Sequence, residues 1–353
     1  MKKVLLGMSG GVDSTVAAYL LKQQGFQVTG AYMKLWRDTE DTQRDQRDLA
    51  KVQHVADLLN IPLQILDLEQ VFFREIVQNF IVQYQSGLTP NPCVICNQKF
   101  KFNLMEQAAD GNFDYLATGH YARIIQAEKS AEYQLWQATS ISKDQSYILY
   151  HLSQEQLARV LLPLGNYDKT EVRSIAAKIG VETDSLSDSQ DICFIPRNKS
   201  YRDLLTRFNA IGKPGNFVDP EGNILGKHLG IGNYTIGQRK NLGMSFGKKV
   251  FVTKIDSATN QITIGELQDL MTSKYSVKDV KWNTLSKPEL PLEVEVANRY
   301  QAKKAQAVIQ KHANQNPDYV EVHCLEPQRA ITPGQAAVFY QGERCIGGGI
   351  IIQ

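Results

Sequence analysis

The first third of the chain alternates short apolar runs with stretches in which apolar residues recur at helical spacing. The run Lys3–Met8 is typical of a buried parallel strand, and Thr15–Gln24 carries its apolar side chains on one helical face. Further strands are predicted at Phe26–Met33, Ile61–Leu68 and Phe113–Thr118. This strand–helix–strand repetition predicts an α/β domain with a doubly wound, Rossmann-like parallel sheet. Ligands of such sheets bind at the carboxyl ends of the strands.

The remainder of the chain changes character twice. Capping-box patterns at Ser153–Gln156 and Asp168–Glu171 predict two helix starts, and Gly180 fits a helix end. Residues 210–247 are rich in Gly and Lys and contain few apolar runs, which predicts a small irregular domain. From about Val250 onward, apolar and polar residues alternate with period two, which is typical of a small all-β barrel or sandwich. We therefore expect an α/β domain at 1–209, an adaptor at 210–272 and a β-barrel at 273–353.

Composition limits the class of protein. The chain has 353 residues, of which 42% are hydrophobic and 22% charged, as in ordinary globular proteins. The longest uncharged stretch, Ile76–Gln98, contains several amides and two prolines, so it does not resemble a membrane span. The apolar run at the N-terminus is too short for a signal peptide. We expect a cytoplasmic protein.

The charge is unevenly distributed. Considered over the whole chain, the net charge of +2 argues against a nucleic-acid partner. Between Lys199 and Lys254, however, ten Lys and Arg residues face three Asp and Glu residues, a net charge of +7. Such a block indicates a localised anionic partner, and the alternative is a solvated face without one.

The segment Ser9–Ser14, with sequence SGGVDS, lies between a predicted strand and a predicted helix. Two glycines allow a sharp turn, and the free N–H groups that open the helix form an anion site. The lysine of a Walker A loop is missing, and the dinucleotide fingerprint is absent too. Asp13 beside a phosphate suits a Mg²⁺ ligand. The motif resembles the PP-loop of the ATP pyrophosphatases, which split ATP between its α and β phosphates and adenylate a substrate oxygen.

Three of the five cysteines have a setting that indicates chemistry. Cys93 and Cys96 form a C-x-x-C pair after Pro90 and Pro92, and we predict a loop there that leads into a helix from about residue 97. A cysteine near a helix start and beside lysines should have a lowered pKa. Cys193 lies in a polar segment about a hundred residues later and can pair with them only if the fold joins them. Cys324 and Cys345 lie in strand-like patterns and are expected to be inert core thiols.

Seven motifs in order make the chain resemble the bacterial tRNA-specific 2-thiouridylases along essentially its full length. They are GMSGGVDS at Gly7–Ser14, GAYMKLW at Gly30–Trp36, NPCVICN at Asn91–Asn97, ATGHYAR at Ala117–Arg123, KDQSY at Lys143–Tyr147, SQDICFI at Ser189–Ile195 and GIGNYTIGQRKNLG at Gly230–Gly243. The resemblance implies a PP-loop catalytic domain, a small adaptor and a C-terminal β-barrel. It also implies a sulfurtransferase that converts the C2 oxygen of the wobble uridine to sulfur at the expense of ATP.

The resemblance also implies roles for individual residues. Cys193 would carry a persulfide received from an upstream sulfur-carrier protein, and Cys96 would be the second nucleophile, ending in a Cys96–Cys193 disulfide. The nucleotide site would comprise Gly7, Met8, Ser9, Gly10, Gly11, Val12, Asp13, Ser14, Met33 and Gly119. The tRNA and its target base would contact Asn91, Pro92, Cys93, His120, Lys143, Asp144, Gln145, Arg299, Tyr300 and Gln335. The basic block would hold backbone phosphates.

Alternatives remain at several of these positions. His120 could simply cap a turn, Lys143–Gln145 could form a solvated loop, and Arg299 with Tyr300 could be a surface pair. Cys93 stands where many family members have Asp, which leaves the proton-transfer assignment open. It also permits a [4Fe–4S] cluster on Cys93, Cys96 and Cys193. Two other functions, a ligase acting on a small metabolite and a non-catalytic tRNA-binding protein, explain fewer of the motifs.

Overall fold

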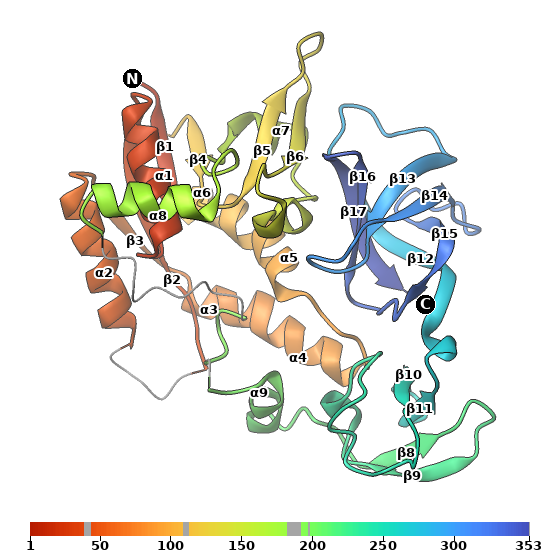
Figure 1. Cartoon of the computed structure of the whole chain (residues 1–353). Coiled ribbons are helices and arrows are strands. Elements are labelled where there is room, and N and C mark those ends of the chain that lie inside the picture. Colours follow the sequence, from red (N-terminus) through yellow and green to blue (C-terminus); the bar gives the residue numbers. More distant parts are fainter. Residues whose placement is uncertain (39–43, 109–112, 182–191, 197, 353) are drawn as a thin grey trace.

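A computed structural model describes residues 1–38, 44–108, 113–181, 192–196 and 198–352. It contains three sheets, which divide the chain into an α/β unit, a middle unit and a barrel (Figure 1). Among the described residues, no helix combines the length and the apolar character required to cross a membrane.

The α/β unit is built on a five-stranded, fully parallel sheet with strand order β3-β2-β1-β4-β7. The strands are β1 (Lys3–Gly7), β2 (Gln27–Lys34), β3 (Leu63–Asp67), β4 (Tyr115–Ala117) and β7 (Val160–Leu161). The four strands predicted from the sequence are confirmed, with bounds that differ by one or two residues. The predicted helix at Thr15–Gln24 is also confirmed, although it begins earlier, at Val12.

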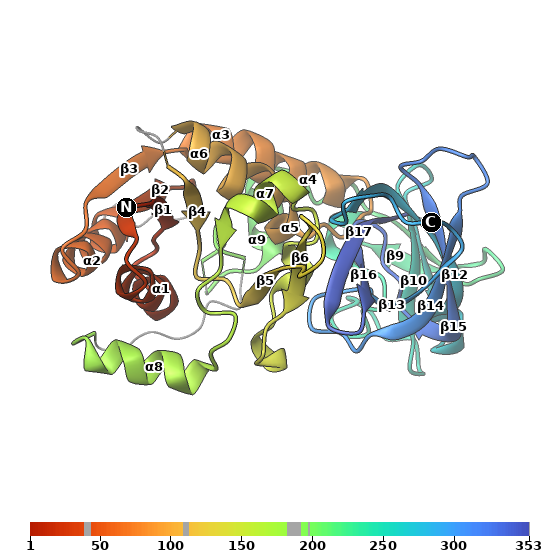
Figure 2. The same cartoon turned by 90° about the horizontal axis from the view of Figure 1, so that it is seen from above.

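Helices cover both faces of this sheet. One face, to which Val4 and Leu6 contribute, packs against α1 (Val12–Gln23), α2 (Arg44–Leu58) and α8 (Lys169–Lys178). The opposite face, which includes Leu5, packs against α3 (Glu69–Phe72), α4 (Gln78–Gln85), α5 (Pro92–Cys96), α6 (Met105–Ala108) and α9 (Tyr201–Arg207). Figure 2 shows the two layers on either side of the sheet. Alternation of side chains along each strand produces the two cores.

The helix starts and the helix end predicted by capping are confirmed. Ser153 opens α7 (Gln154–Arg159) and Asp168 opens α8, each within a complete capping box. Gly180 follows α8 with a φ of 82°, the left-handed conformation in which glycine commonly ends helices.

The prediction of a loop across the two prolines is wrong. Helix α5 begins at Pro92, with Asn91 as its N-cap, and runs into a π-helical stretch at Asn97–Leu104. Proline at the first helical position is tolerated because its missing N–H would have no partner within the helix there. Cys93 and Cys96 therefore lie within a helix rather than in a loop before one.

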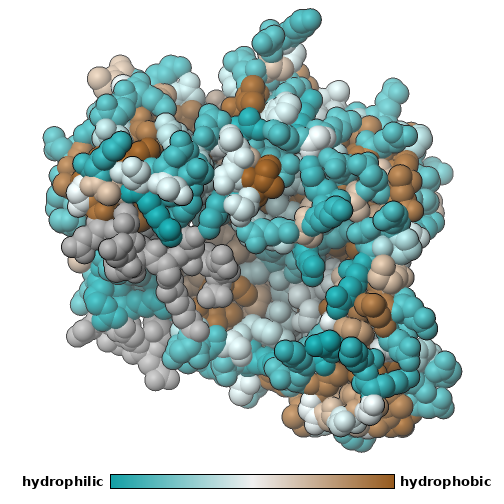
Figure 3. Space-filling model, in the orientation of Figure 1, coloured by the Kyte–Doolittle hydropathy of each residue, from teal (hydrophilic) through white to brown (hydrophobic). Residues whose placement is uncertain are grey.

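The middle unit is a four-stranded sheet with strand order β10-β11-β8-β9 and a small core of its own around Phe217 and Val252. Its strands are β8 (Gly215–Val218), β9 (Ile224–His228), β10 (Phe251–Asp256) and β11 (Gln261–Gly265). It contains more regular structure than the sequence pattern indicated, because strands of four to six residues leave little periodicity. Figure 3 shows a mostly hydrophilic face, with hydrophobic residues gathered over this unit at the lower right.

The C-terminal part is a closed six-stranded barrel, since β12 pairs with both β15 and β17. Its strands are β12 (Met271–Trp282), β13 (Leu292–Ala297), β14 (Ala305–Lys311), β15 (Val320–Arg329), β16 (Ala336–Gln341) and β17 (Arg344–Ile352). A hairpin from the α/β unit, β5 (Ala122–Gln126) and β6 (Tyr133–Gln137), adds to the barrel sheet by pairing β6 with β17. The two units thus share one hydrogen-bonded sheet.

Candidate active site

The SGGVDS loop connects the carboxyl end of β1 to the start of α1. Gly11 is the N-cap of α1, and its carbonyl accepts hydrogen bonds from the Thr15 amide (3.1 Å) and from the Ser14 and Thr15 hydroxyls. Ser9 and Ser14 meet across the turn, with 3.4 Å between their hydroxyl oxygens. Gly10 has a φ of 74°, and a Cβ there would lie 3.1 Å from a Val52 methyl group. The loop is therefore held in one shape around the free N–H groups of the helix.

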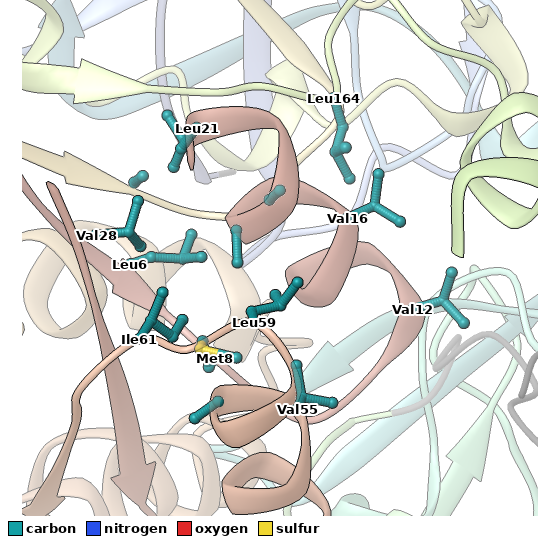
Figure 4. Close-up of a cluster of buried hydrophobic side chains, with 14 of the residues drawn as sticks. Leu6, Met8, Val12, Val16, Leu21, Val28, Val55, Leu59, Ile61 and Leu164 are labelled. Carbon is teal, nitrogen blue, oxygen red and sulfur yellow. The ribbon is translucent and has the colours of Figure 1, made fainter. Parts of the chain in front are cut away.

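The other residues predicted for the nucleotide site are divided between the loop surface and the core. A Cβ on Gly119, just after β4, would lie 3.1 Å from the Ser14 nitrogen, so this glycine packs directly against the loop. Met33 on β2 reaches Gly7, where its methyl group would lie 3.9 Å from a Cβ on that glycine. Met8 and Val12 point into the core beneath (Figure 4), so only their backbone can face a ligand.

Asp13, the predicted Mg²⁺ ligand, already has two partners that the sequence analysis missed. The Lys169 ammonium donates to both of its carboxylate oxygens, at 2.7 and 2.9 Å, and the Tyr121 hydroxyl donates to one of them at 2.7 Å. Lys169 is the first residue of α8 and Tyr121 follows β4. No local pattern connects residues 156 positions apart, so only the fold could reveal this group.

Cys93, Cys96 and Cys193 are brought together on the other side of the sheet. Cys96 is buried in the core that also contains Phe194 and Ile195, the two residues after Cys193. Cys93 and Cys193 are exposed, and all five cysteines of the chain are free thiols. Part of the segment before Cys193, residues 189–191 of the SQDICFI motif, lies outside the described residues. The fold therefore joins the two predicted nucleophiles.

The expectation of lowered thiol pKa values is wrong. Burial raises the pKa of Cys93 to about 11 and that of Cys96 to about 12, and it raises the pKa of Cys193 as well. The positive charge of Lys101 opposes burial at all three thiols. Cys93 and Cys193 retain accessible surface, but neighbouring protein atoms remove enough water to disfavour the thiolate. All three thiols are protonated near neutral pH in this state.

His120 is buried and links Lys101 to the predicted tRNA residue Gln145. Its Nδ1 lies 3.1 Å from the Gln145 side-chain oxygen, which also accepts from the Tyr121 amide at 3.0 Å. Its Nε2 lies 3.0 Å from the Asn97 side-chain oxygen and 3.2 Å from the Lys101 ammonium, so the ring is held between three polar side chains. Burial and the nearby Lys101 lower the pKa of His120 to about 3, so the ring is neutral.

Asp144 has a structural position within the predicted tRNA segment 143–145. Its buried carboxylate accepts from the Ala138 amide at 2.9 Å, the Ser146 hydroxyl at 2.7 Å and the Gln137 amide group at 3.1 Å. These bonds fix the loop on which Lys143 and Gln145 lie. A direct contact of any of the three with tRNA stays a prediction.

The barrel contributes its predicted residues next to the cysteine helix. Gln335 donates to the Thr89 carbonyl at 2.8 Å, and the Thr89 amide donates to the Pro333 carbonyl at 3.0 Å. The Tyr300 ring packs 6.0 Å from that of Tyr147, and burial, followed by the charges of Asp144 and Cys93, raises the pKa of Tyr300. Arg299 is exposed beside it. The turn at 332–335 thus supports the chain just before Asn91 and Pro92.

The arrangement of potential metal ligands does not fit the alternative of a [4Fe–4S] cluster. Within the described part of the chain, no group of three or more His, Cys, Asp or Glu side chains is arranged to hold a metal ion. Within the loop Ser9–Ser14, Asp13 carries a carboxylate, a ligand that Mg²⁺ takes together with phosphate oxygens.

Three family models match the chain in succession. They are the tRNA methyl transferase HUP domain over residues 2–197, the tRNA methyl transferase PRC-barrel domain over 203–266 and the aminomethyltransferase β-barrel domain over 272–351. The tRNA-specific 2-thiouridylase MnmA of Clostridium perfringens is 44% identical over 99% of this chain and 98% of its own length. The chain belongs to the tRNA-specific 2-thiouridylase family.

A second family member agrees with this assignment. The enzyme of the same name from Clostridium botulinum strain Alaska E43 is 45% identical over 99% of this chain and 98% of its own. A solved 4-thiouridine synthetase–RNA complex with bound ATP is 20% identical, covers 58% of this chain and 50% of that one, and has a TM-score of 0.36. The family assignment therefore rests on the sequence relatives.

Proposed function

We propose that this chain is an ATP-dependent tRNA-uridine 2-sulfurtransferase of the cytoplasm, with the SGGVDS loop as its nucleotide site and Cys193 and Cys96 as its sulfur-transfer pair. The observation that carries the proposal is that the segment of Cys193 packs into the core that buries Cys96, with Lys101 near both thiols, in a unit that also holds the loop. A ligase acting on a small metabolite would use the loop but has no need of this cysteine pair.

Activation of the uracil comes first. The C2 oxygen of the uridine attacks the α-phosphorus of ATP, the bond to the β-phosphate oxygen breaks, and pyrophosphate leaves. The amide groups at the start of α1 and the hydroxyl of Ser9 hold phosphate oxygens, while the Ser14 hydroxyl donates to the Gly11 carbonyl and supports the turn. Mg²⁺ on Asp13 would neutralise phosphate charge. The product is an adenylated uridine whose oxygen departs as AMP, a far better leaving group than oxide.

Sulfur transfer then uses both cysteines. The outer sulfur of a Cys193 persulfide attacks C2, and AMP leaves with the former O2. The Cys96 thiolate attacks the Cys193 sulfur, the sulfur–sulfur bond breaks, and 2-thiouridine is released. The outer sulfur gains two electrons while the cysteine pair loses two and becomes a disulfide. A thiol reductant restores the pair, and a sulfur-carrier protein reloads Cys193.

Because the thiol pKa values are raised, this step requires that Cys96 first lose its proton. Cys96 is protonated in the free protein because burial raises its pKa. Lys101 is the cation that favours its thiolate, and the Lys101 ammonium lies 3.2 Å from Nε2 of the neutral His120 ring. We infer that this pair of side chains positions the charge that the attacking sulfur needs.

Binding of the tRNA is assigned to the middle unit and the rim of the cysteine site. Six cationic side chains of the basic block are exposed and have no ion pair among the described residues: Lys213, Lys227, Arg239, Lys240, Lys249 and Lys254. They would hold backbone phosphates. Asn91, Cys93, Tyr300 and Gln335 would surround the extruded uridine, a setting of polar and aromatic groups suited to a base out of its stack.

The experiment is a thiolation assay with an unmodified tRNA transcript, ATP, Mg²⁺ and a persulfide donor, in which 2-thiouridine, AMP and pyrophosphate are all measured. We expect Cys193→Ser and Cys96→Ser to form no 2-thiouridine while still binding tRNA. The matched control is Cys324→Ser, a buried barrel thiol outside the site, which should retain activity. Normal 2-thiouridine yield from Cys193→Ser would refute the sulfur assignment. Pyrophosphate release with a small acid and without tRNA would favour the ligase.

A further inference from the structure

Lys169 brings to the SGGVDS loop the cationic side chain that the motif itself lacks. The SGGVDS loop lacks the lysine with which Walker A loops contact phosphates. Lys169 comes from the segment after β7, the strand beyond β4 in the parallel sheet, and its ammonium reaches the loop at Asp13. A cation is therefore supplied to the anion site from a distant part of the chain.

The lysine is held firmly in this place. Helix α8 starts with a complete capping box on Asp168, and Val172 and Ala176 pack in the same core as Val12 and Val16 of α1. The Lys169 side chain is 15% exposed and its ammonium lies 5.8 Å from the centre of the Tyr121 ring. Its position is thus set by two packed helices and a tyrosine, not by a flexible surface.

The pairing with Asp13 has a consequence for nucleotide binding. A carboxylate beside the phosphates of ATP repels them unless a cation lies between. In the free protein, Lys169 neutralises Asp13 through two short hydrogen bonds. Mg²⁺ held by Asp13 would compete with Lys169 for this carboxylate, and the released ammonium would be available to phosphate oxygens bound at the loop.

We propose that Lys169 is a phosphate-binding residue of the nucleotide site, held by Asp13 in the free protein and transferred to the ATP phosphates when the nucleotide binds. This inference rests on the proposed nucleotide site. It assigns to Lys169 the part that the Walker lysine plays in other loops, and to Tyr121 the part of retaining Asp13 in place during the exchange.

The test is calorimetric titration of ATP, AMP and adenosine into the full-length protein, with and without Mg²⁺. Lys169→Met should weaken ATP binding about 10- to 100-fold, the range for one charge-assisted hydrogen bond, and leave adenosine binding within about twofold. Lys169→Arg should retain most of the ATP affinity. The matched control is Lys178→Met, which removes the same charge from the exposed far end of α8 and should bind ATP normally.

A double variant separates phosphate contact from mere support of Asp13. In the Asp13→Asn background, Lys169→Met should still weaken ATP binding if the ammonium touches phosphate. This double variant removes both charges of the Asp13–Lys169 pair, so it also serves if Lys169→Met alone folds poorly. The inference would be overturned if Asp13→Asn and the double variant bound ATP with equal affinity. It would also be overturned if Lys169→Met bound ATP as tightly as the unaltered protein. Failure of the unaltered protein to bind ATP would instead refute the proposed function.

Discussion

The turn at 332–335 of the barrel supports the chain that leads into the cysteine helix, and Gly334 allows the closest approach. Its φ is 94°, and a Cβ there would lie 3.0 Å from both the nitrogen and the carbonyl oxygen of Thr89. We predict that Gly334→Ala lowers the thiolation rate at least about tenfold, because it displaces the chain before Asn91 and a shift of about 1 Å at a reacting group suffices for that.

The magnitude follows from two contributions. An L-residue at positive φ costs about 1–2 kcal/mol, and overpacking against a backbone that cannot move freely costs about 1–3 kcal/mol. The expected strain is about 2–5 kcal/mol for Gly334→Ala. Gly342, in the turn between β16 and β17, has a φ of 61°, and a Cβ there would have no atom within 4 Å. Gly342→Ala therefore carries the first contribution alone, about 1–2 kcal/mol.

The assay compares single-turnover thiolation, ATP affinity and melting temperature for the two variants. Gly334→Ala should lose thiolation rate while retaining ATP affinity, because the SGGVDS loop is a separate part of the α/β unit. Gly342→Ala should keep both and lose only stability. Equal thiolation rates in the two variants would show that the barrel turn does not position the cysteine helix.

Three further predictions concern charge. Lys101→Met should move the thiolation pH profile to higher pH, because Lys101 opposes the burial that raises the thiol pKa values, and Lys101→Arg should not; an unmoved profile would contradict this role. Burial lowers the pKa of His151 from 6.5 to about 4, so between these values the unfolded chain binds one more proton than the folded protein. The free energy of unfolding should therefore decrease as the pH is lowered from 6.5 toward 4, by up to about 1.4 kcal/mol per pH unit for this group. Chemical denaturation of the protein and of His151→Leu at several pH values tests this, and identical pH dependences would refute it. Arg239→Gln with Lys249→Gln should reduce the slope of log tRNA affinity against log salt by about 2, and an unchanged slope would remove these two from the interface.

Periodicity and capping predicted the elements that local sequence determines. The strands around the nucleotide loop and the starts of α7 and α8 follow from apolar runs and side-chain caps. The loop itself was recognisable because its glycines and hydroxyls are contiguous. These features need only short-range interactions, and the structure confirms them.

Features that depend on the environment could not be predicted in this way. The lysines beside Cys93 and Cys96 indicated lowered pKa values, but burial outweighs them, and burial is a property of the folded core. Pro92 indicated a break, yet its role depends on whether it falls at the first helical position. Each error came from reading a residue without its neighbours in space.

Contacts between distant segments were also invisible in the sequence. Lys169 and Tyr121 meet Asp13 only because α8 packs on α1 and β4 ends beside the loop. The hairpin β5–β6 falls within the predicted α/β domain at 1–209, but it extends the barrel sheet through β17. Both arrangements become apparent only when the sheet order is known.

The most direct test of the sulfur-transfer pathway follows one sulfur atom. The protein is loaded with heavy-isotope persulfide, freed of donor, and mixed with unmodified tRNA, ATP and Mg²⁺ for a single turnover. We predict that the label leaves the peptide containing Cys193 and appears in 2-thiouridine, in step with AMP release and with formation of a Cys96–Cys193 disulfide. Labelled sulfur that remains on Cys193 while unlabelled 2-thiouridine forms would contradict the account.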